Sequence, residues 1–139
     1  MGVFLDLKED REAYWRQVIE DARHHGEPER IIAGVRSVEQ AEYFRRNLPD
    51  AGQVGLIPSQ ADIEQFVAAG VKTIRLWPEW LAEKGVVERL HEAGAGLHVS
   101  VGRGTREEAV PMLASGPVSL FTDDPGRLIQ TLEDLRAGR

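Results

Sequence analysis

The sequence has 139 residues, of which 17 are lysine or arginine and 23 are aspartate or glutamate, so its formal net charge is −6. Its hydrophobic fraction of 42% and charged fraction of 29% are typical of a globular protein, and its length fits a single domain over residues 1–139. The negative charge disfavours nonspecific binding to nucleic acid or to anionic membranes, and the absence of cysteine excludes disulfides and thiolate metal sites.

Six short runs along the chain have the length of β-strands. They are mainly apolar, which is typical of parallel strands that are buried on both faces. In chain order these predicted strands are Val3–Lys8, Ile31–Val35, Gln53–Ile57, Thr73–Trp77, Leu97–Val101 and Val118–Thr122.

A segment with apolar residues at three- and four-residue spacing follows each predicted strand. This spacing predicts six amphipathic helices, whose apolar positions lie within residues 14–22, 38–48, 63–67, 81–90, 109–113 and 128–135. Their starts are predicted from capping residues at Ser37, Ser59 and Thr105 and from a proline at Pro78. Glycines in the left-handed conformation are predicted to end four of them, at Gly26, Gly70, Gly94 and Gly116.

The last unit has the clearest local pattern. The predicted strand Val118–Thr122 runs directly into a Thr-Asp-Asp-Pro turn. Asp123 or Asp124 can accept hydrogen bonds from free helix amides, and Pro125 suits the first position of a helix because it lacks an amide hydrogen. This stretch therefore predicts a strand, a tight turn and a helix in immediate succession.

Regular alternation of strands and helices with short loops indicates an α/β fold with a parallel sheet and right-handed crossovers. Such units form either an open sheet or a barrel, and periodicity alone does not choose between them. No Gly-x-Gly-x-x-Gly motif follows the first predicted strand, so an open nucleotide-binding sheet has no support from the sequence.

Three segments, in their order and spacing, resemble the glycerophosphodiester phosphodiesterase family. Phe4–Lys8 is similar to the third strand of that family, His91–Gly94 with Leu97–Val101 to the approach to its seventh, and Thr122–Pro125 to its eighth. The resemblance covers almost the whole chain, in register with the last six βα units. It implies a TIM-barrel type of (βα)6 fold that is an incomplete or small barrel, without the N-terminal catalytic quarter.

Members of this family are metal-dependent hydrolases that cleave glycerophosphodiesters, and their chemistry requires a His-Arg-Gly motif, a His-Asp motif and a Glu-x-Asp pair. None of these motifs occurs in this sequence. The resemblance therefore implies a phosphodiesterase-like protein of glycerophospholipid metabolism that has no catalytic residue and little or no activity alone. The alternative is a noncatalytic phosphate-binding or assembly module. The histidines lie at other positions, namely His24, His25, His91 and His98.

Asp6 stands where the family has a metal-binding glutamate, and Lys8 follows two residues later. The two-residue period of a strand would point both side chains the same way, toward a cation and a phosphate. A weak Ca²⁺ or Mg²⁺ site at Asp6 and a phosphate contact at Lys8 are the resulting expectations. The alternative is that Asp6 and Lys8 pair with each other or with solvent.

A short glycine pair surrounds an arginine after the fifth predicted strand. Gly102 and Gly104 would let an anion approach the backbone at the start of the next helix, and Arg103 could grip a phosphate. The family commonly has asparagine at the position of Arg103 and tryptophan at that of Ser100, so this chain departs from its pattern there. The alternative is a solvated loop with an exposed arginine.

Trp77 and Trp80 flank a predicted helix start and are candidates for a pocket mouth or a subunit contact, with core packing as the alternative. His98 alternates with apolar residues on a predicted strand, which is typical of a hydrogen-bonded core histidine.

A six-unit barrel leaves two strands with unpaired edges, Val3–Lys8 and Val118–Thr122. We expect a homo-oligomer that covers these edges, and the alternatives are closure of a smaller barrel or a second polypeptide. A small phosphate-containing ligand is the other expected partner, and neither nucleic acid nor a membrane is expected. The first residues lack the pattern of a secretory signal, and no apolar run approaches the roughly 20 residues that cross a bilayer, so we expect a cytoplasmic protein.

Overall fold

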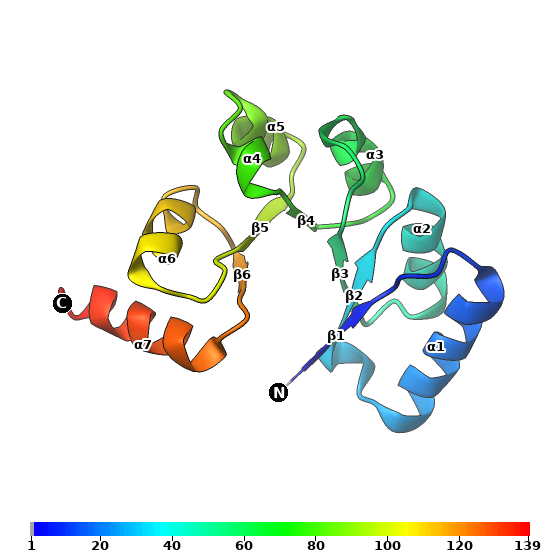
Figure 1. Cartoon of the computed structure of the whole chain (residues 1–139). Coiled ribbons are helices and arrows are strands. Elements are labelled where there is room, and N and C mark those ends of the chain that lie inside the picture. Colours follow the sequence, from blue (N-terminus) through cyan, green and yellow to red (C-terminus); the bar gives the residue numbers. More distant parts are fainter. Residues whose placement is uncertain (1) are drawn as a thin grey trace.

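The computed structural model describes residues 2–139, and its centre is a six-stranded sheet in which every pair of neighbours is parallel (Figure 1). The strands follow chain order across the sheet: β1 (Val3–Asp6), β2 (Ile31–Val35), β3 (Gly52–Gly55), β4 (Thr73–Arg75), β5 (Gly96–Ser100) and β6 (Ser119–Phe121). The sheet curls into a half-barrel and carries the helices on its outside. The predicted α/β fold of the TIM-barrel type, incomplete, is therefore confirmed.

Helices connect consecutive strands, as the spacing predicts. They are α1 (Glu12–His25), α2 (Val38–Asn47), α3 (Ile63–Ala68), α4 (Pro78–Leu81), α5 (Val86–Glu92), α6 (Arg106–Leu113) and α7 (Pro125–Arg136), with 3-10 turns η1 (Pro28–Arg30) and η2 (Gln60–Asp62). The prediction of six helices is wrong by one, because the segment 81–90 is divided into α4 and α5. Gly85 lies between them with φ of +86°, a left-handed conformation that interrupts an α-helix. None of these helices over residues 2–139 is long and apolar enough to cross a bilayer.

Several strands end earlier than predicted. β1 stops at Asp6 rather than Lys8, because its pairing with β2 ends where Asp6 lies opposite Gly34. β4 stops at Arg75 rather than Trp77, since Trp77 is already the residue that precedes α4. The remaining differences are shifts of one or two residues. Apolar sequence thus continues past the strand ends into the turns toward the helices.

Local capping largely follows the sequence. The side chains of Ser37, Thr105 and Asp124 accept hydrogen bonds from amides three residues later, at 3.1, 3.4 and 3.0 Å, as predicted. Ser59 caps η2 rather than α3. The predicted left-handed conformation of Gly26 is wrong: its φ is −122°, and its amide donates to the carbonyl oxygen of Ala22 at 3.0 Å, which closes the last turn of α1.

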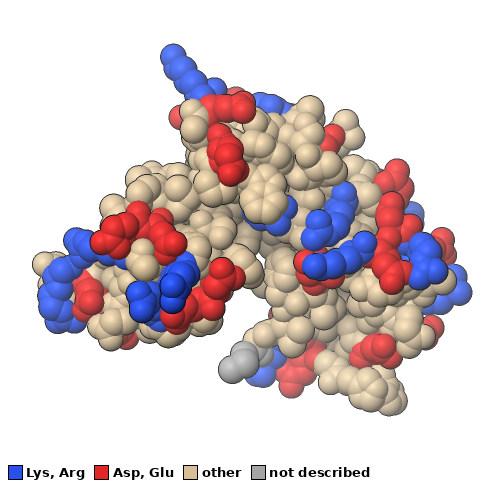
Figure 2. Space-filling view, viewed as in Figure 1, with Lys and Arg blue, Asp and Glu red and all other residues tan. Residues whose placement is uncertain are grey.

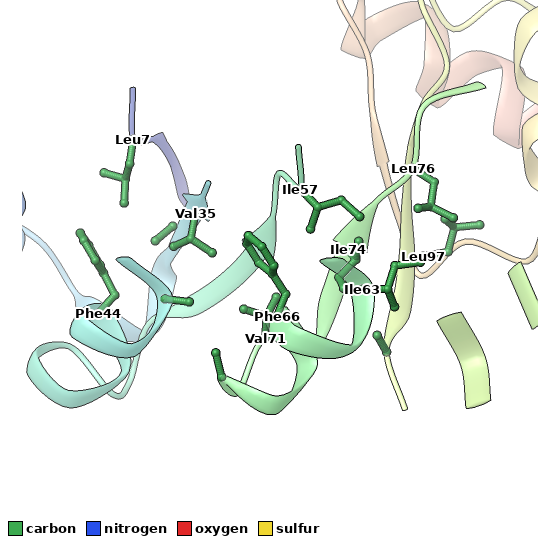
Figure 3. Packing of buried hydrophobic residues seen from close by; sticks show 14 of the residues in the cluster. Leu7, Val35, Phe44, Ile57, Ile63, Phe66, Val71, Ile74, Leu76 and Leu97 are labelled. Atoms are coloured by element: carbon green, nitrogen blue, oxygen red, sulfur yellow. The ribbon is translucent and has the colours of Figure 1, made fainter. Parts of the chain in front are cut away.

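The apolar core lies between the outer face of the sheet and the helices. Alternate strand residues point outward into this layer, where they meet apolar side chains from the helices (Figure 3). The most deeply buried members include Leu7, Val35, Phe44, Ile57, Ile63, Ile74, Leu76 and Leu97. The strand residues between them point to the concave side of the sheet, and some of these line the candidate site.

Candidate functional site

A pocket of about 150 Å³ opens on the concave side of the sheet. Several of its lining residues are the last residues of their strands, so it lies where ligands bind in parallel α/β folds, at the carboxyl ends. The lining residues are Phe4, Asp6, Leu56, Arg75, Trp77, His98, Ser100 and Phe121. A larger hollow lies elsewhere, on the outer side between β1 and α1, away from these strand ends.

Arg75 is the least satisfied polar group in the pocket. Its Nε atom is buried and has no hydrogen-bond partner within residues 2–139. The guanidinium lies over the ring of Trp77, 3.8 Å from the ring centroid. Burial lowers the pKa of Arg75, the positive charge of Arg36 lowers it further, and the charge of Asp6 acts in the opposite direction. Because arginine remains charged in proteins, Arg75 is a cation with unused hydrogen-bonding capacity.

Asp6 is paired with two cations. Arg36 donates a hydrogen bond to Asp6 Oδ1 at 2.7 Å, and Lys8 Nζ lies 3.6 Å from Asp6 Oδ2. The contact between Asp6 and Lys8 corresponds to the alternative in which these residues pair with each other. With Arg75 included, three cations gather around one carboxylate in a protein of net charge −6.

The donor atoms around Asp6 do not complete a site for Ca²⁺ or Mg²⁺. Asp6 is the one carboxylate that lines the pocket, and it is engaged by Arg36 and Lys8. Across residues 2–139 no three histidine, aspartate or glutamate side chains gather as a metal would require. The metal at Asp6 therefore stays a prediction, and no chemistry is assigned to it.

His98 is buried and faces the pocket. Its Nδ1 atom lies 2.7 Å from Ser119 Oγ, and its ring stacks against Phe4 with the ring centroids 6.5 Å apart. Burial lowers the pKa of His98, and the charge of Arg75 lowers it further, so the imidazole is neutral at neutral pH. The expected hydrogen bond is present, but the side chain lies on the concave side rather than in the helix-packed core.

The low pKa of His98 predicts a specific loss of stability in mild acid. The folded pKa lies below the unfolded value of about 6.5, so this contribution to stability is complete above that pH and is lost as the pH falls below it. Between about pH 7.5 and 5.5, we expect the urea midpoint of the His98→Gln variant to fall less than that of the parent. An identical decrease in both proteins would contradict this assignment.

The loop around Arg103 does bind an anionic group, which is the carboxylate of Glu108 in the same chain. The amides of Arg103 and Thr105 each donate to Glu108 Oε2 at 3.1 Å, and Thr105 and Glu108 form a capping box at the start of α6. The backbone hydrogen bond from Thr105 is the main cause that lowers the pKa of Glu108. A phosphate held by Gly102, Arg103 and Gly104 stays a prediction, and it would have to displace this carboxylate.

The two tryptophans have different surroundings. Trp77 is 41% exposed, lines the concave pocket and stacks on Arg75. Trp80 is half-buried and packs against the apolar core, as in the alternative considered for it. Only Trp77 therefore contributes to the pocket.

Sequence reasoning missed Arg36 and Arg75. The signal for Arg75 is its place in Thr-Ile-Arg-Leu-Trp, where a charged residue interrupts an apolar strand between Ile74 and Leu76. A strand that is buried on both faces is not expected to alternate, so the charged Arg75 between the apolar Ile74 and Leu76 has no place in that prediction. Figure 2 shows lysine and arginine atoms near the centre of the viewed face, with aspartate or glutamate atoms next to some of them.

No protein-family model matches the sequence, and no curated protein matches it. Solved structures do. A protein from Silicibacter pomeroyi DSS-3 assigned as a glycerophosphoryl diester phosphodiesterase is 21% identical, with a TM-score of 0.73 over 97% of this chain and 51% of its own. The glycerophosphodiester phosphodiesterase from Agrobacterium tumefaciens is 17% identical, with a TM-score of 0.69 over 93% of this chain and 55% of its own. A glycerophosphoryl diester phosphodiesterase from Parabacteroides distasonis is 18% identical, with a TM-score of 0.68 over 97% of this chain and 51% of its own.

The chain thus spans about half the length of the structures that it matches. At these identities the likeness concerns the backbone, and it agrees with the family that the three sequence segments resemble. This chain therefore has the fold of about half of a glycerophosphodiester phosphodiesterase.

Proposed function

We propose that this chain binds a small glycerol-phosphate type of ligand in the concave pocket and, by itself, does not hydrolyse it. The observation that carries the proposal is the half-buried guanidinium of Arg75, whose Nε has no hydrogen-bond partner within the described chain. A phosphate oxygen would accept that hydrogen bond and offset the repulsion between Arg75 and Arg36. The names of the matching structures favour a glycerophosphodiester or its glycerol phosphate as the source of that group.

The rest of the pocket suits such a ligand. Guanidinium groups bind phosphate through paired, charge-assisted hydrogen bonds, and Arg36 is a second cation next to Asp6. Phe4, Trp77 and Phe121 are each between 41% and 54% exposed and supply apolar walls for the carbon part of the ligand. The small volume of the pocket favours a ligand of few atoms.

Binding without hydrolysis follows from the acid and base groups in the pocket. The family that the sequence resembles uses two histidines, whereas the pocket is lined by one, His98. The Nδ1 atom of His98 is engaged with Ser119, and the one carboxylate, Asp6, is paired with Arg36 and Lys8. No second imidazole lines the pocket to carry the other proton transfer.

The test is calorimetric titration with glycerol 3-phosphate and with glycerophosphocholine. The parent is expected to bind, and Arg75→Met is expected to weaken binding about tenfold or more, because one charge-assisted hydrogen bond is lost. Arg46→Met, which removes an exposed arginine of α2, is the matched control and should bind like the parent. Equal affinities of the parent and Arg75→Met would contradict the proposal.

Three companion measurements separate binding in the concave pocket from binding at the Gly102–Gly104 loop, from unfolding and from hydrolysis. Arg103→Ala should leave the affinity unchanged, and a loss there would place the phosphate at that loop instead. Arg75→Met should not lower the urea midpoint, because methionine fills similar space and avoids burying a charge without a partner. Incubation of the parent with glycerophosphocholine and Ca²⁺ or Mg²⁺ should release no product; release that Asp6→Ala abolishes would show a metal-dependent hydrolase.

A further inference from the structure

The curled sheet has two open edges. Within residues 2–139, β1 pairs with β2 alone and β6 pairs with β5 alone. Figure 1 shows β1 and α1 on one side of the opening and β6, α6 and α7 on the other. The space-filling view has a deep indentation between these two sides (Figure 2). Open edges with apolar side chains favour association with another chain.

The first edge carries an apolar groove. It has a volume of about 670 Å³ and lies between β1, α1 and the segment that follows α1. Val3, Leu5, Val18 and Ala22 form its apolar walls, and Val3 is 56% exposed. Asp21, Glu27 and Arg30 place charged groups in its lining, and Arg30 Nε lies 2.8 Å from Glu27 Oε2.

The second edge carries an apolar ridge. On α7, Leu128 points into the core, whereas the next residue, Ile129, is 58% exposed. Val118, just before β6, is 67% exposed, whereas Phe121 at the end of β6 faces the concave pocket. The exposed charged residues of this helix are of both signs, Arg136 and Glu133 among them, and Arg127 is paired with Asp124 at 3.7 Å.

The arrangement within the chain shows how these edges would fit. Neighbouring helices pack side by side around the half-barrel, as α1 does with α2, α2 with α3 and α6 with α7. The groove lies where α1 would meet a preceding helix, and Ile129 lies on the last helix, which has no following neighbour among the described residues. A second copy would supply both missing neighbours at once if its β6 lay parallel to β1.

We propose that the chain forms a two-fold symmetric dimer in which α7 and β6 of each copy pack against the β1 groove of the other. The contact joins unlike edges, and such contacts either close into a ring or continue as a fibre. With two copies, both seams are identical and no edge strand remains open.

Oligomeric mass measured by light scattering and native mass spectrometry tests the proposal at tens of micromolar protein. The parent should have twice the chain mass of 15.5 kDa. Val3→Glu and Ile129→Glu should each give a monomer that keeps the circular dichroism of the parent. Val110→Glu is the matched control, because Val110 is also an exposed apolar residue, at 43%, but lies on α6 outside both edges, and it should stay dimeric.

Mixing the two monomeric variants tests which edges meet. The α7 of the Val3→Glu copy and the groove of the Ile129→Glu copy are both intact, so a mixed dimer with one working seam should form. Contact between like edges would instead leave one of the two variants dimeric by itself. A monomeric parent, a dimeric Val3→Glu or Ile129→Glu variant, or failure of the mixture to associate would overturn the proposal.

Discussion

Replacing Gly104 with alanine is expected to lower the free energy of unfolding by about 3 kcal/mol or more. Gly104 has φ of +73°, which L-residues other than glycine adopt only with strain. A Cβ atom at this position would also lie 2.8 and 2.9 Å from the Cα and N atoms of Leu128. These are backbone atoms of α7 and cannot rotate away, so the whole helix would have to shift.

Urea unfolding followed by circular dichroism measures this effect, and Gly116→Ala is the matched control. Gly116 has a similar φ of +69°, but a Cβ atom added there would have no neighbouring atom within 4 Å. The control should therefore show only the backbone strain, about 1 kcal/mol. Equal losses in the two variants would mean that α7 does not pack against the Gly102–Gly104 loop as described.

The Phe44→Ala variant is expected to lose about 4 kcal/mol of stability. Phe44 lies on α2, is 1% exposed, and fills the layer between the helices and the outer face of the sheet (Figure 3). Its replacement removes a large apolar side chain and leaves a cavity that the surrounding residues cannot fill. The measurement is the free energy of unfolding from urea titration at fixed protein concentration.

Phe121→Ala is the matched control for this loss, because it removes the same side chain from a site that is 54% exposed. Both substitutions are best made in the Ile129→Glu background, so that association between copies does not contribute. We expect the control to lose less than about 1 kcal/mol. If both variants lost the same stability, the core would not lie on the outer side of the sheet.

Much of the succession of elements could be predicted from the sequence. Apolar runs and three- to four-residue spacing located all six strands and the helical segments between them. Ser37, Thr105 and Asp124 cap their helices as expected because each reaches an amide only three residues away. The division at Gly85 was missed, since the apolar spacing continues across it.

The contacts of the site were less predictable. The expectation that Gly102–Gly104 favours an anion had a sound local basis, but Glu108 supplies that anion from the same turn. Asp6 was expected to be available to a cation, yet it contacts Arg36, which lies 30 residues later. Strands that are buried on both faces give no reason to place Arg75 in a site, whereas its position on the concave face does.

The sequence by itself therefore determined the order of strands and helices and most of the helix starts, because these depend on residues within about four positions of one another. Only the tertiary structure decided how far the sheet curls and which alternate strand residues face its concave side. That curvature brings Asp6, Arg36, Arg75 and His98 together from four separate segments and leaves Arg75 with unused hydrogen-bonding capacity. Such proximity arises from strand pairing between distant parts of the chain, which local spacing does not encode.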